Sequence, residues 1–322
     1  MSVLVTGATG FVGGHLVDHL LAAGTSVTAL VRDPRKAAPL AGRGVRLIEG
    51  DLRDSAALAK ACARQQVVYH VAGATAARDE AAFMEINKAG TARLVAAAEA
   101  AAVDRFVLVS SLAAGGPARP DRPLDGTEAP RPLTRYGRSK LAGEVAVRAA
   151  KLAWTIVRPP AVYGPADREM FRIFRAVSLG AAPVFGDGSQ QLSLIFGPDL
   201  AAALVAAGTS PATVGGVYYA AHPERVTSRE LVATVAAAAG RRPWVIPVPF
   251  VVGRIFLAAT EAVARLIDRP TVLTRDKGKE LFQDAWICDP SPLTRATGWR
   301  AEHPLASGAT ITIDWYRQHK WL

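Results

Sequence analysis

Three glycines near the N-terminus constrain the fold of this chain more than any other feature. They have the spacing G-x-x-G-x-x-G within residues 6–13, directly after an apolar run and directly before an amphipathic helical pattern. In that context Gly7 permits a tight turn, Gly10 lets the backbone approach a pyrophosphate, and Gly13 allows close helix–strand packing. The helix N-terminus adds free N–H groups and a positive dipole. The stretch predicts a dinucleotide site with contacts from Gly7, Thr9, Gly10, Phe11, Val12 and Gly13.

Residues 1–158 alternate short β-branched runs with alanine-rich helical stretches. We expect strands at 2–6, 26–31, 45–49, 66–70, 105–110 and 154–157, and helices near 11–23, 55–64, 80–102 and 134–151. This alternation predicts βαβ units and a parallel, doubly wound sheet. The runs are apolar throughout, as in strands covered on both faces. We therefore expect an α/β fold with a Rossmann-type dinucleotide-binding domain over residues 1–158.

The pattern becomes less regular after Arg158. Pro and Gly cluster at 159–160, 164–165, 183, 186–188 and 197–198. Long structured loops that follow a rigid sheet are usual places for a substrate site. Residues 159–322 are expected to form mainly a smaller, discontinuous substrate-binding region, with later segments returning to the first domain.

Charge and cysteine content exclude several classes of function. The net charge is +10, but the basic residues are scattered, without a run of five or more, so we expect no nucleic-acid partner. Cys62 and Cys288 lack the spacing of metal ligands or of a disulfide framework. We expect no metal site and two buried cysteines in a reducing compartment. The first expected strand begins at residue 2, so we expect no signal peptide and a cytoplasmic protein.

No uncharged apolar run reaches the ~20 residues of a membrane span. The nearest, 244–260, is interrupted by Pro247, Pro249 and Arg254. We interpret it as a packed helix of the substrate region and expect no membrane association. A membrane-facing helix is the alternative.

The end of the second strand indicates which dinucleotide is bound. An acidic residue there would bind both ribose hydroxyls and repel a 2′-phosphate, but Arg32 stands at this point. A guanidinium can pair with a phosphate bidentately, and Lys36 adds charge nearby. This pattern predicts NADP(H) over NAD(H), unless Asp33 turns toward the ribose. Asp51 and Leu52 follow the third strand and are expected at the adenine, although Asp51 could instead cap the next helix.

Tyr136 and Lys140 are four residues apart near the start of a helical stretch, so their side chains share one face. A phenol with a pKa of about 10 is a poor base at neutral pH, and a nearby ammonium lowers that pKa. Ser111, at the end of the fifth strand, can donate a hydrogen bond to a substrate oxygen. We predict Ser111, Tyr136 and Lys140 as the catalytic residues.

These motifs together resemble the extended short-chain dehydrogenase/reductase superfamily, the NAD-dependent epimerase/dehydratase-like proteins, over nearly the whole chain. The matching segments, in family order, are 6–13, 51–52, 70–74, Asn87 with 90–91, 110–111, Tyr136 with Lys140, 158–165, 287–289, 297–299 and 315–316. The resemblance implies Tyr136 as general acid/base, Lys140 as its partner and a ribose anchor, and Ser111 as oxygen donor. It also implies a homodimer through helices 80–102 and 134–151. Further cofactor contacts implied by it are Ala72, Gly73, Ala74, Asn87, Ser110, Pro159, Ala161 and Val162.

Three departures separate this chain from many sugar-nucleotide members of that superfamily, and one is the missing acidic ribose residue described above. Ala161 stands where they often carry Asn, and Leu192 where they often carry an Arg that reaches the diphosphate. The pattern is closest to the 3β-hydroxysteroid dehydrogenase and dihydroflavonol-4-reductase branch. We expect an NADP(H)-dependent oxidoreductase that interconverts a ketone and a secondary alcohol on a small or hydrophobic substrate.

Two alternatives remain. The first is a nucleotide-sugar 4-epimerase or dehydratase with tightly bound NAD(P), in which Arg168, Arg172 and Arg175 could bind phosphate; otherwise these three form a solvated helix face. The second is a non-catalytic dinucleotide sensor, against which the intact Tyr136–Lys140 pair argues.

Overall fold

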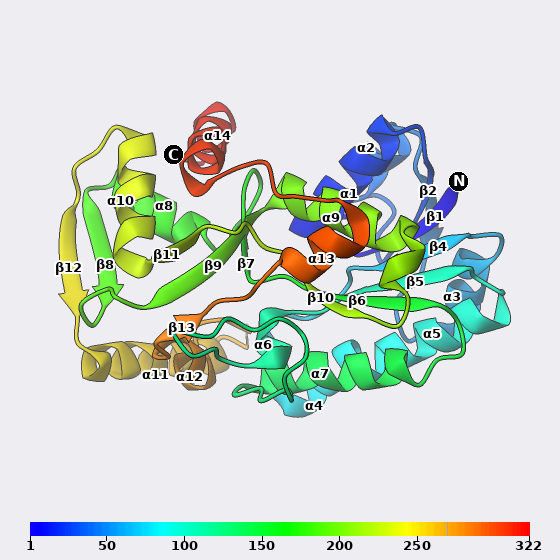
Figure 1. The fold of residues 1–322 in the computed structure, drawn as a ribbon, viewed down its shortest axis with the longest axis horizontal. Coiled ribbons are helices and arrows are strands. Elements are labelled where there is room, and N and C mark those ends of the chain that lie inside the picture. Colours follow the sequence, from blue (N-terminus) through cyan, green and yellow to red (C-terminus); the bar gives the residue numbers. More distant parts are fainter. Residues whose placement is uncertain (269) are drawn as a thin grey trace.

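Seven parallel strands form the central sheet, in the order β10-β6-β5-β4-β1-β2-β3 (Figure 1). The computed structural model describes residues 1–268 and 270–322. The strands are β1 (Ser2–Thr6), β2 (Ser26–Val31), β3 (Arg46–Glu49), β4 (Val67–His70), β5 (Arg105–Val109), β6 (Trp154–Arg158) and β10 (Val217–Tyr219). The doubly wound α/β fold is confirmed, and the six expected strands all form. Sequence analysis did not predict β10.

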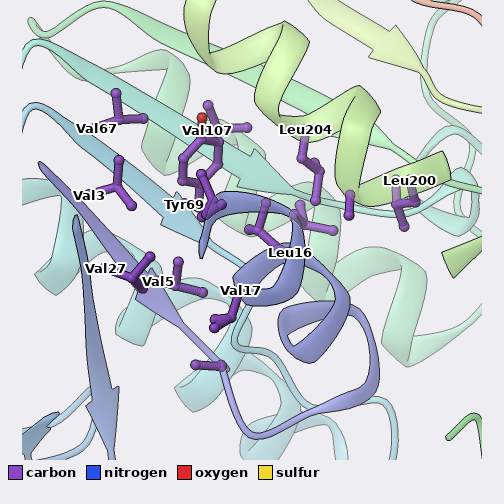
Figure 2. Packing of buried hydrophobic residues seen from close by; sticks show 14 of the residues in the cluster. Val3, Val5, Leu16, Val17, Val27, Val67, Tyr69, Val107, Leu200 and Leu204 are labelled. Atoms are coloured by element: carbon purple, nitrogen blue, oxygen red, sulfur yellow. The ribbon is translucent and has the colours of Figure 1, made fainter. Parts of the chain in front are cut away.

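Helices cover both faces of this sheet, so its strands are buried. One face packs against α1 (Phe11–Ala22), α2 (Ala38–Ala41), α9 (Gly197–Thr209) and α13 (Ser291–Thr297). The other packs against α3 (Ser55–Cys62), α5 (Thr91–Ala100) and α7 (Arg135–Arg148). In Figure 2, Val5 and Tyr69 of the sheet face Leu16 of α1 and Leu204 of α9. Because α9 and β10 belong to this layer, residues beyond 197 return to the first sheet.

The helix expected over 80–102 forms in three pieces. These are α4 (Glu80–Met84), a π-helical turn η1 (Glu85–Gly90) and α5. The prediction of one continuous α-helix was therefore wrong at its centre. π-turns often accompany functional sites. Here the turn holds Asn87, whose side chain bonds outside its own helix.

The smaller region surrounds a second core. Its strand β9 (Gln191–Phe196) pairs with β7 (Ala161–Tyr163), β11 (Arg225–Thr227) and β13 (Ala285–Trp286), while β8 (Ala181–Phe185) pairs with β12 (Trp244–Val248). Its core is built with α8 (Phe171–Ser178), α10 (Ser228–Ala239) and α14 (Leu305–Gln318). The remaining helical elements are α6 (Leu112–Gly115), η2 (Pro211–Thr213), α11 (Phe250–Leu266) and α12 (Arg275–Leu281).

The sequence suggested one helix over the segment 244–260, but the segment does not form one. Residues 244–248 form β12, and α11 begins only at Phe250. Pro247 and Pro249 account for the break, since proline cannot continue a helix and favours extended backbone before it. No helix within the described parts of the chain is both long and apolar enough to cross a membrane.

A buried ion pair connects α7 to the sheet. Arg158 at the end of β6 donates from Nε and Nη2 to the two carboxylate oxygens of Glu144 on α7, at 2.8 and 2.7 Å. Ser110, just after β5, donates to the same carboxylate at 2.5 Å. Both charged side chains are fully buried. The pair therefore fixes the helix against the ends of two strands.

Arg158→Met is expected to lower the free energy of unfolding by about 3–5 kcal/mol, because it leaves the Glu144 carboxylate buried without its partner. Urea denaturation would measure this loss. The double variant Arg158→Met/Glu144→Met should be less destabilised, since the fully buried Glu144 carboxylate is removed as well and the charged groups that lose a partner, Arg148 and Glu128, are partly exposed. As a control, Arg93→Met removes an exposed ion pair with Glu85 and should cost about 1 kcal/mol or less. A loss in the double variant as large as in the single variant would contradict this role.

Candidate active site

The C-terminal ends of the central strands open into one large cleft. Its volume is about 2230 Å³, and its walls come from both the central sheet and the smaller region. Ligand pockets of roughly 300–1,000 Å³ suffice for one small molecule. This cleft therefore has room for a dinucleotide together with a substrate, at the sheet edge where open α/β folds bind ligands.

The glycine turn between β1 and α1 forms one end of the cleft. Gly7 has φ +75°, and a Cβ on it would lie 2.7 Å from the backbone nitrogen of Ala72. A Cβ on Gly13 would lie 2.0 Å from the Gly7 carbonyl oxygen. No side chain caps α1 and no acidic residue occupies its first turn. The free N–H groups of this turn fit a pyrophosphate, and Thr9, Gly10, Phe11 and Val12 line the cleft beside it.

The loop after β3 brings Asp51 and Leu52 to the cleft wall. Asp51 does not cap α3, because the carboxylate of Asp54 accepts from the Ala57 N–H at 3.0 Å and fills that role. Instead Asp51 accepts from Arg53 Nη2 at 2.6 Å, and hydrogen bonds from Arg53 hold its pKa below the usual range. Sequence analysis missed Arg53, which also lines the cleft.

Only some of the residues in the positive loop after β2 line the cleft. Arg32 lines the cleft, together with a smaller hollow bounded by Asp51 and Arg53. Asp33 accepts from the Arg35 N–H at 3.0 Å, and Lys36 Nζ lies 3.9 Å from its carboxylate. Neither Asp33 nor Lys36 is part of the described cleft wall. Arg32 is thus the member of this loop placed to meet a ligand.

All three predicted catalytic residues line the cleft. Tyr136 and Lys140 lie one turn apart on α7, and Ser111 follows β5. Lys140 Nζ donates to the Val109 carbonyl at 2.6 Å, and burial lowers its pKa to about 8. Burial raises the pKa of Tyr136 to about 12, against a hydrogen bond with Ser111 that lowers it. The Glu280 carboxylate raises this pKa further, so burial and charge both oppose the lowering that the sequence suggested.

Two further predicted residues support the wall of the cleft. Ser110 lines it, but its hydroxyl is directed to Glu144. Asn87 is buried and lies behind the wall. Its Oδ1 accepts from the Ala74 N–H at 2.8 Å, and its Nδ2 donates to the Ala74 carbonyl at 3.0 Å and to Ser139 at 2.9 Å. Asn87 therefore positions the loop of Ala72, Gly73 and Ala74, which itself lines the cleft.

The far side of the cleft is mainly apolar. Pro159, Ala161 and Val162 lead into it from β6 and β7. Other apolar lining side chains come from segments far apart in the sequence: Phe83, Ile173, Val184, Leu192, Leu257 and Trp286. The sequence had pointed to Leu192 and to the apolar segment that contains Leu257. No local motif marks the others, because they reach the cleft only through tertiary packing.

Charged groups near the mouth include two of the three arginines considered for phosphate. Arg168 precedes α8, and its guanidinium lies over the Trp321 ring, 5.6 Å from the centroid. Arg168 and Arg172 line the cleft, whereas Arg175 is exposed and not part of the described wall. The three do not form one helix face, since α8 begins at Phe171.

Glu280 on α12 connects the smaller region to the catalytic helix. It is buried in the cleft wall and accepts hydrogen bonds from Thr134 and Lys277. Thr134 is the N-cap of α7, where its hydroxyl oxygen also accepts from the Gly137 N–H at 3.0 Å. The carboxylate thus fixes the start of the helix that carries Tyr136. Sequence analysis did not single out Glu280, because only the tertiary fold brings it to α7.

The chain belongs to the NAD-dependent epimerase/dehydratase family, whose profile matches residues 3–221. The membership confirms the resemblance to extended short-chain dehydrogenases/reductases, and the protein is an NAD(P)-dependent enzyme.

Individual relatives include both reductases and a protein that binds sugar nucleotides. A ceramide reductase of Caulobacter vibrioides is 36% identical over 99% of this chain and 96% of its own length. A 2-alkyl-3-oxoalkanoate reductase of Stenotrophomonas maltophilia is 31% identical over 74% of this chain and 76% of its own. Among solved structures, MoeE5 in complex with UDP-glucuronic acid and NAD is 27% identical, with a TM-score of 0.80 over 99% of this chain and 100% of that chain.

The buried Lys140 should make stability depend on pH. Its pKa of about 8 in the folded state lies below the ~10.4 of an unfolded lysine, so the unfolded chain binds more protons between these values. The unfolding free energy of the wild type should therefore rise relative to Lys140→Met, by about 1–3 kcal/mol between about pH 7 and pH 10. Urea titrations of both proteins across this range would measure the change. A difference that stays constant with pH would contradict a depressed lysine pKa.

Proposed function

We propose that the enzyme is an NADP(H)-dependent reductase of an apolar, chain-bearing ketone, working reversibly with the corresponding secondary alcohol. The observation that carries the proposal is the cleft beyond Tyr136, which is lined by apolar side chains such as Ile173, Leu192 and Trp286. Burial of apolar surface there would stabilise a hydrocarbon chain by about 0.8 kcal/mol per methylene.

The chain supplies the acid–base chemistry of this reaction. When bound, the nicotinamide cofactor supplies the hydride. The Tyr136 phenol donates its proton to the ketone oxygen during reduction and takes it back in the reverse direction. Ser111 donates a hydrogen bond to the same oxygen and so orients the carbonyl. The Lys140 ammonium, one helical turn away on α7, would favour the tyrosinate that remains by charge attraction.

The names of two relatives support an apolar substrate. A ceramide carries long hydrocarbon chains, and a 2-alkyl-3-oxoalkanoate carries both alkyl groups and a ketone. The match to the ceramide reductase extends over nearly the full length of both chains, so it includes the smaller region that forms the apolar wall.

A second candidate is a nucleotide-sugar epimerase or dehydratase. Arg168 and Arg172 at the cleft wall favour it, because they could bind a diphosphate, and MoeE5 was solved with UDP-glucuronic acid. Leu192 argues against it, because an apolar side chain there cannot pair with phosphate. We therefore place this function second.

Tyr136→Phe is expected to lower kcat for ketone reduction by about 10²–10⁴-fold, because the variant has no proton to donate. Its affinity for the cofactor should stay close to that of the wild type. Nicotinamide absorbance gives the rate, and a binding titration gives the affinity. Tyr218→Phe is the matched control and should retain full activity, because Tyr218 lies on the edge strand β10, donates to the Ala212 carbonyl and is not part of the described cleft wall.

The same assay with ketones of increasing chain length tests the substrate class. We expect kcat/KM to rise about threefold to fourfold per added methylene until the cleft is filled. The enzyme should not convert UDP- or dTDP-sugars in this assay. Conversion of a sugar nucleotide without net change in absorbance would replace the reductase proposal with the epimerase. Full ketone turnover by Tyr136→Phe would refute the role of the tyrosine.

Arg32→Ala is expected to weaken NADP⁺ binding about tenfold to a hundredfold, because a charge-assisted hydrogen bond to the 2′-phosphate contributes about 1.5–3 kcal/mol. NAD⁺ binding should change little. Calorimetric titration of both dinucleotides would measure the ratio. Arg35→Ala is the matched control, since Arg35 lies in the same loop but is highly exposed beside Asp33. Tighter binding of NAD⁺ than of NADP⁺ by the wild type would overturn the cofactor preference.

A further inference from the structure

The outer surface of β12 and α11 is apolar where it meets solvent. Both elements lie at the end of the smaller region, away from the N-terminus (Figure 1). Trp244 is 83% exposed and Leu266 is 85% exposed. We name this surface the α11 face and define it by six exposed side chains: Trp244, Ile246, Val251, Ile255, Val263 and Leu266. An exposed apolar surface of this kind indicates a site where a partner binds.

Packing within the chain explains only one side of α11. Gly253 and Leu257 are buried, and Thr260 and Ala264 continue the same stripe at helical spacing. Val251, Ile255 and Leu266 point the other way. A surface helix normally presents polar residues on that outer side. The expectation of a helix packed into the substrate region therefore holds for its inner stripe alone.

The inner side of the same helix forms part of the cleft. Phe256, Leu257 and Ala264 line the cavity, and Phe256 is exposed as well. A single helix therefore separates the α11 face from the apolar wall of the cleft, a thickness of about 10 Å. An apolar ligand held at this face would have a short path into the site.

The charged residues around the α11 face indicate which kind of partner it binds. Arg241 and Arg242 precede β12, and Arg254 and Arg265 lie along one flank of α11. Of the acidic groups nearby, Glu261 is largely covered and pairs with Arg265, while Asp268 lies 3.8 Å from Arg78 Nη1. The margin is therefore positive, like the whole chain at +10. Anionic headgroups complement such a margin, whereas a second copy of the face would bring like charges together.

We propose that the α11 face docks on the surface of an anionic lipid bilayer, with α11 lying along the headgroup region. Exposed aromatic and aliphatic side chains bordered by arginines suit that depth, where Trp is favoured. This is the membrane-facing alternative raised by the sequence. The docking is inferred from the surface residues alone. The idea that docking delivers an apolar ketone to the cleft rests on the proposed function.

Vesicle co-sedimentation of the full chain, without cofactor or ketone, tests the docking. The protein should sediment with vesicles of phosphatidylcholine and phosphatidylglycerol, less with phosphatidylcholine alone, and less at high salt. Ile255→Asp/Val263→Asp should weaken the partition at least about tenfold. These positions are 65% and 55% exposed, so the substitutions leave the core intact. The matched control is Val214→Asp/Ile311→Asp, at positions 49% and 41% exposed on other elements, and it should bind as the wild type does.

A second measurement reports the contact directly. Brominated phosphatidylcholine in the anionic vesicles should quench the indole fluorescence of the wild type, and Trp244→Phe should lower the quenched fraction. Wild-type protein that stays in solution with anionic vesicles would overturn the proposal. An equal loss of binding in the control variant Val214→Asp/Ile311→Asp would also overturn it. If Ile255→Asp/Val263→Asp instead splits a wild-type dimer and leaves sedimentation unchanged, the α11 face binds a second copy of the chain and the proposal is wrong. Failure of every ketone to react would refute only the proposed function.

Discussion

The buried contact between Glu144 and Arg158 is the interaction on which the site depends. Arg158 ends β6, Ser110 follows β5, and Glu144 lies one turn beyond Lys140 on α7. Three elements are therefore joined at one carboxylate, in a place from which water is excluded. A buried charge without its partner is costly, so alternative positions of α7 are disfavoured. The helix α7 is held in register with the strand ends from both sides, since Glu280 fixes its N-cap from α12.

The two halves of the cleft are built by different physical means. The cofactor half depends on backbone: close approach at Gly7 and Gly13, and free N–H groups at the start of α1. Its tolerance for substitution is small, because an added Cβ would collide with other backbone atoms. The substrate half depends on side chains from α8, β8, β9 and α11. Such a wall can change its shape without disturbing the fold, which accounts for a family that contains both reductases and sugar-nucleotide enzymes.

The helix α11 has two apolar sides with different roles. Its inner stripe closes the cleft, and its outer stripe forms the α11 face. Docking of that face on a bilayer would place the apolar wall of the cleft, one helix away, near a reservoir of apolar molecules. A poorly water-soluble substrate would then avoid crossing the solvent. The arginines beside the face add attraction without requiring a helix that spans the membrane.

The sequence by itself determined the sheet, the glycine turn and the placement of Tyr136 and Lys140 on one helix, because these depend on local patterns. Glycine spacing, apolar runs and the i, i+4 relation of Tyr136 and Lys140 are all contained in short stretches. It did not determine β10, the π-turn at Asn87, or the break at Pro249 between β12 and α11. Nor could it bring Arg53 beside Arg32, or Glu280 to the N-terminus of α7. Only the tertiary structure decided these, because they depend on contacts between residues distant in the chain, which packing and burial select and local propensity does not.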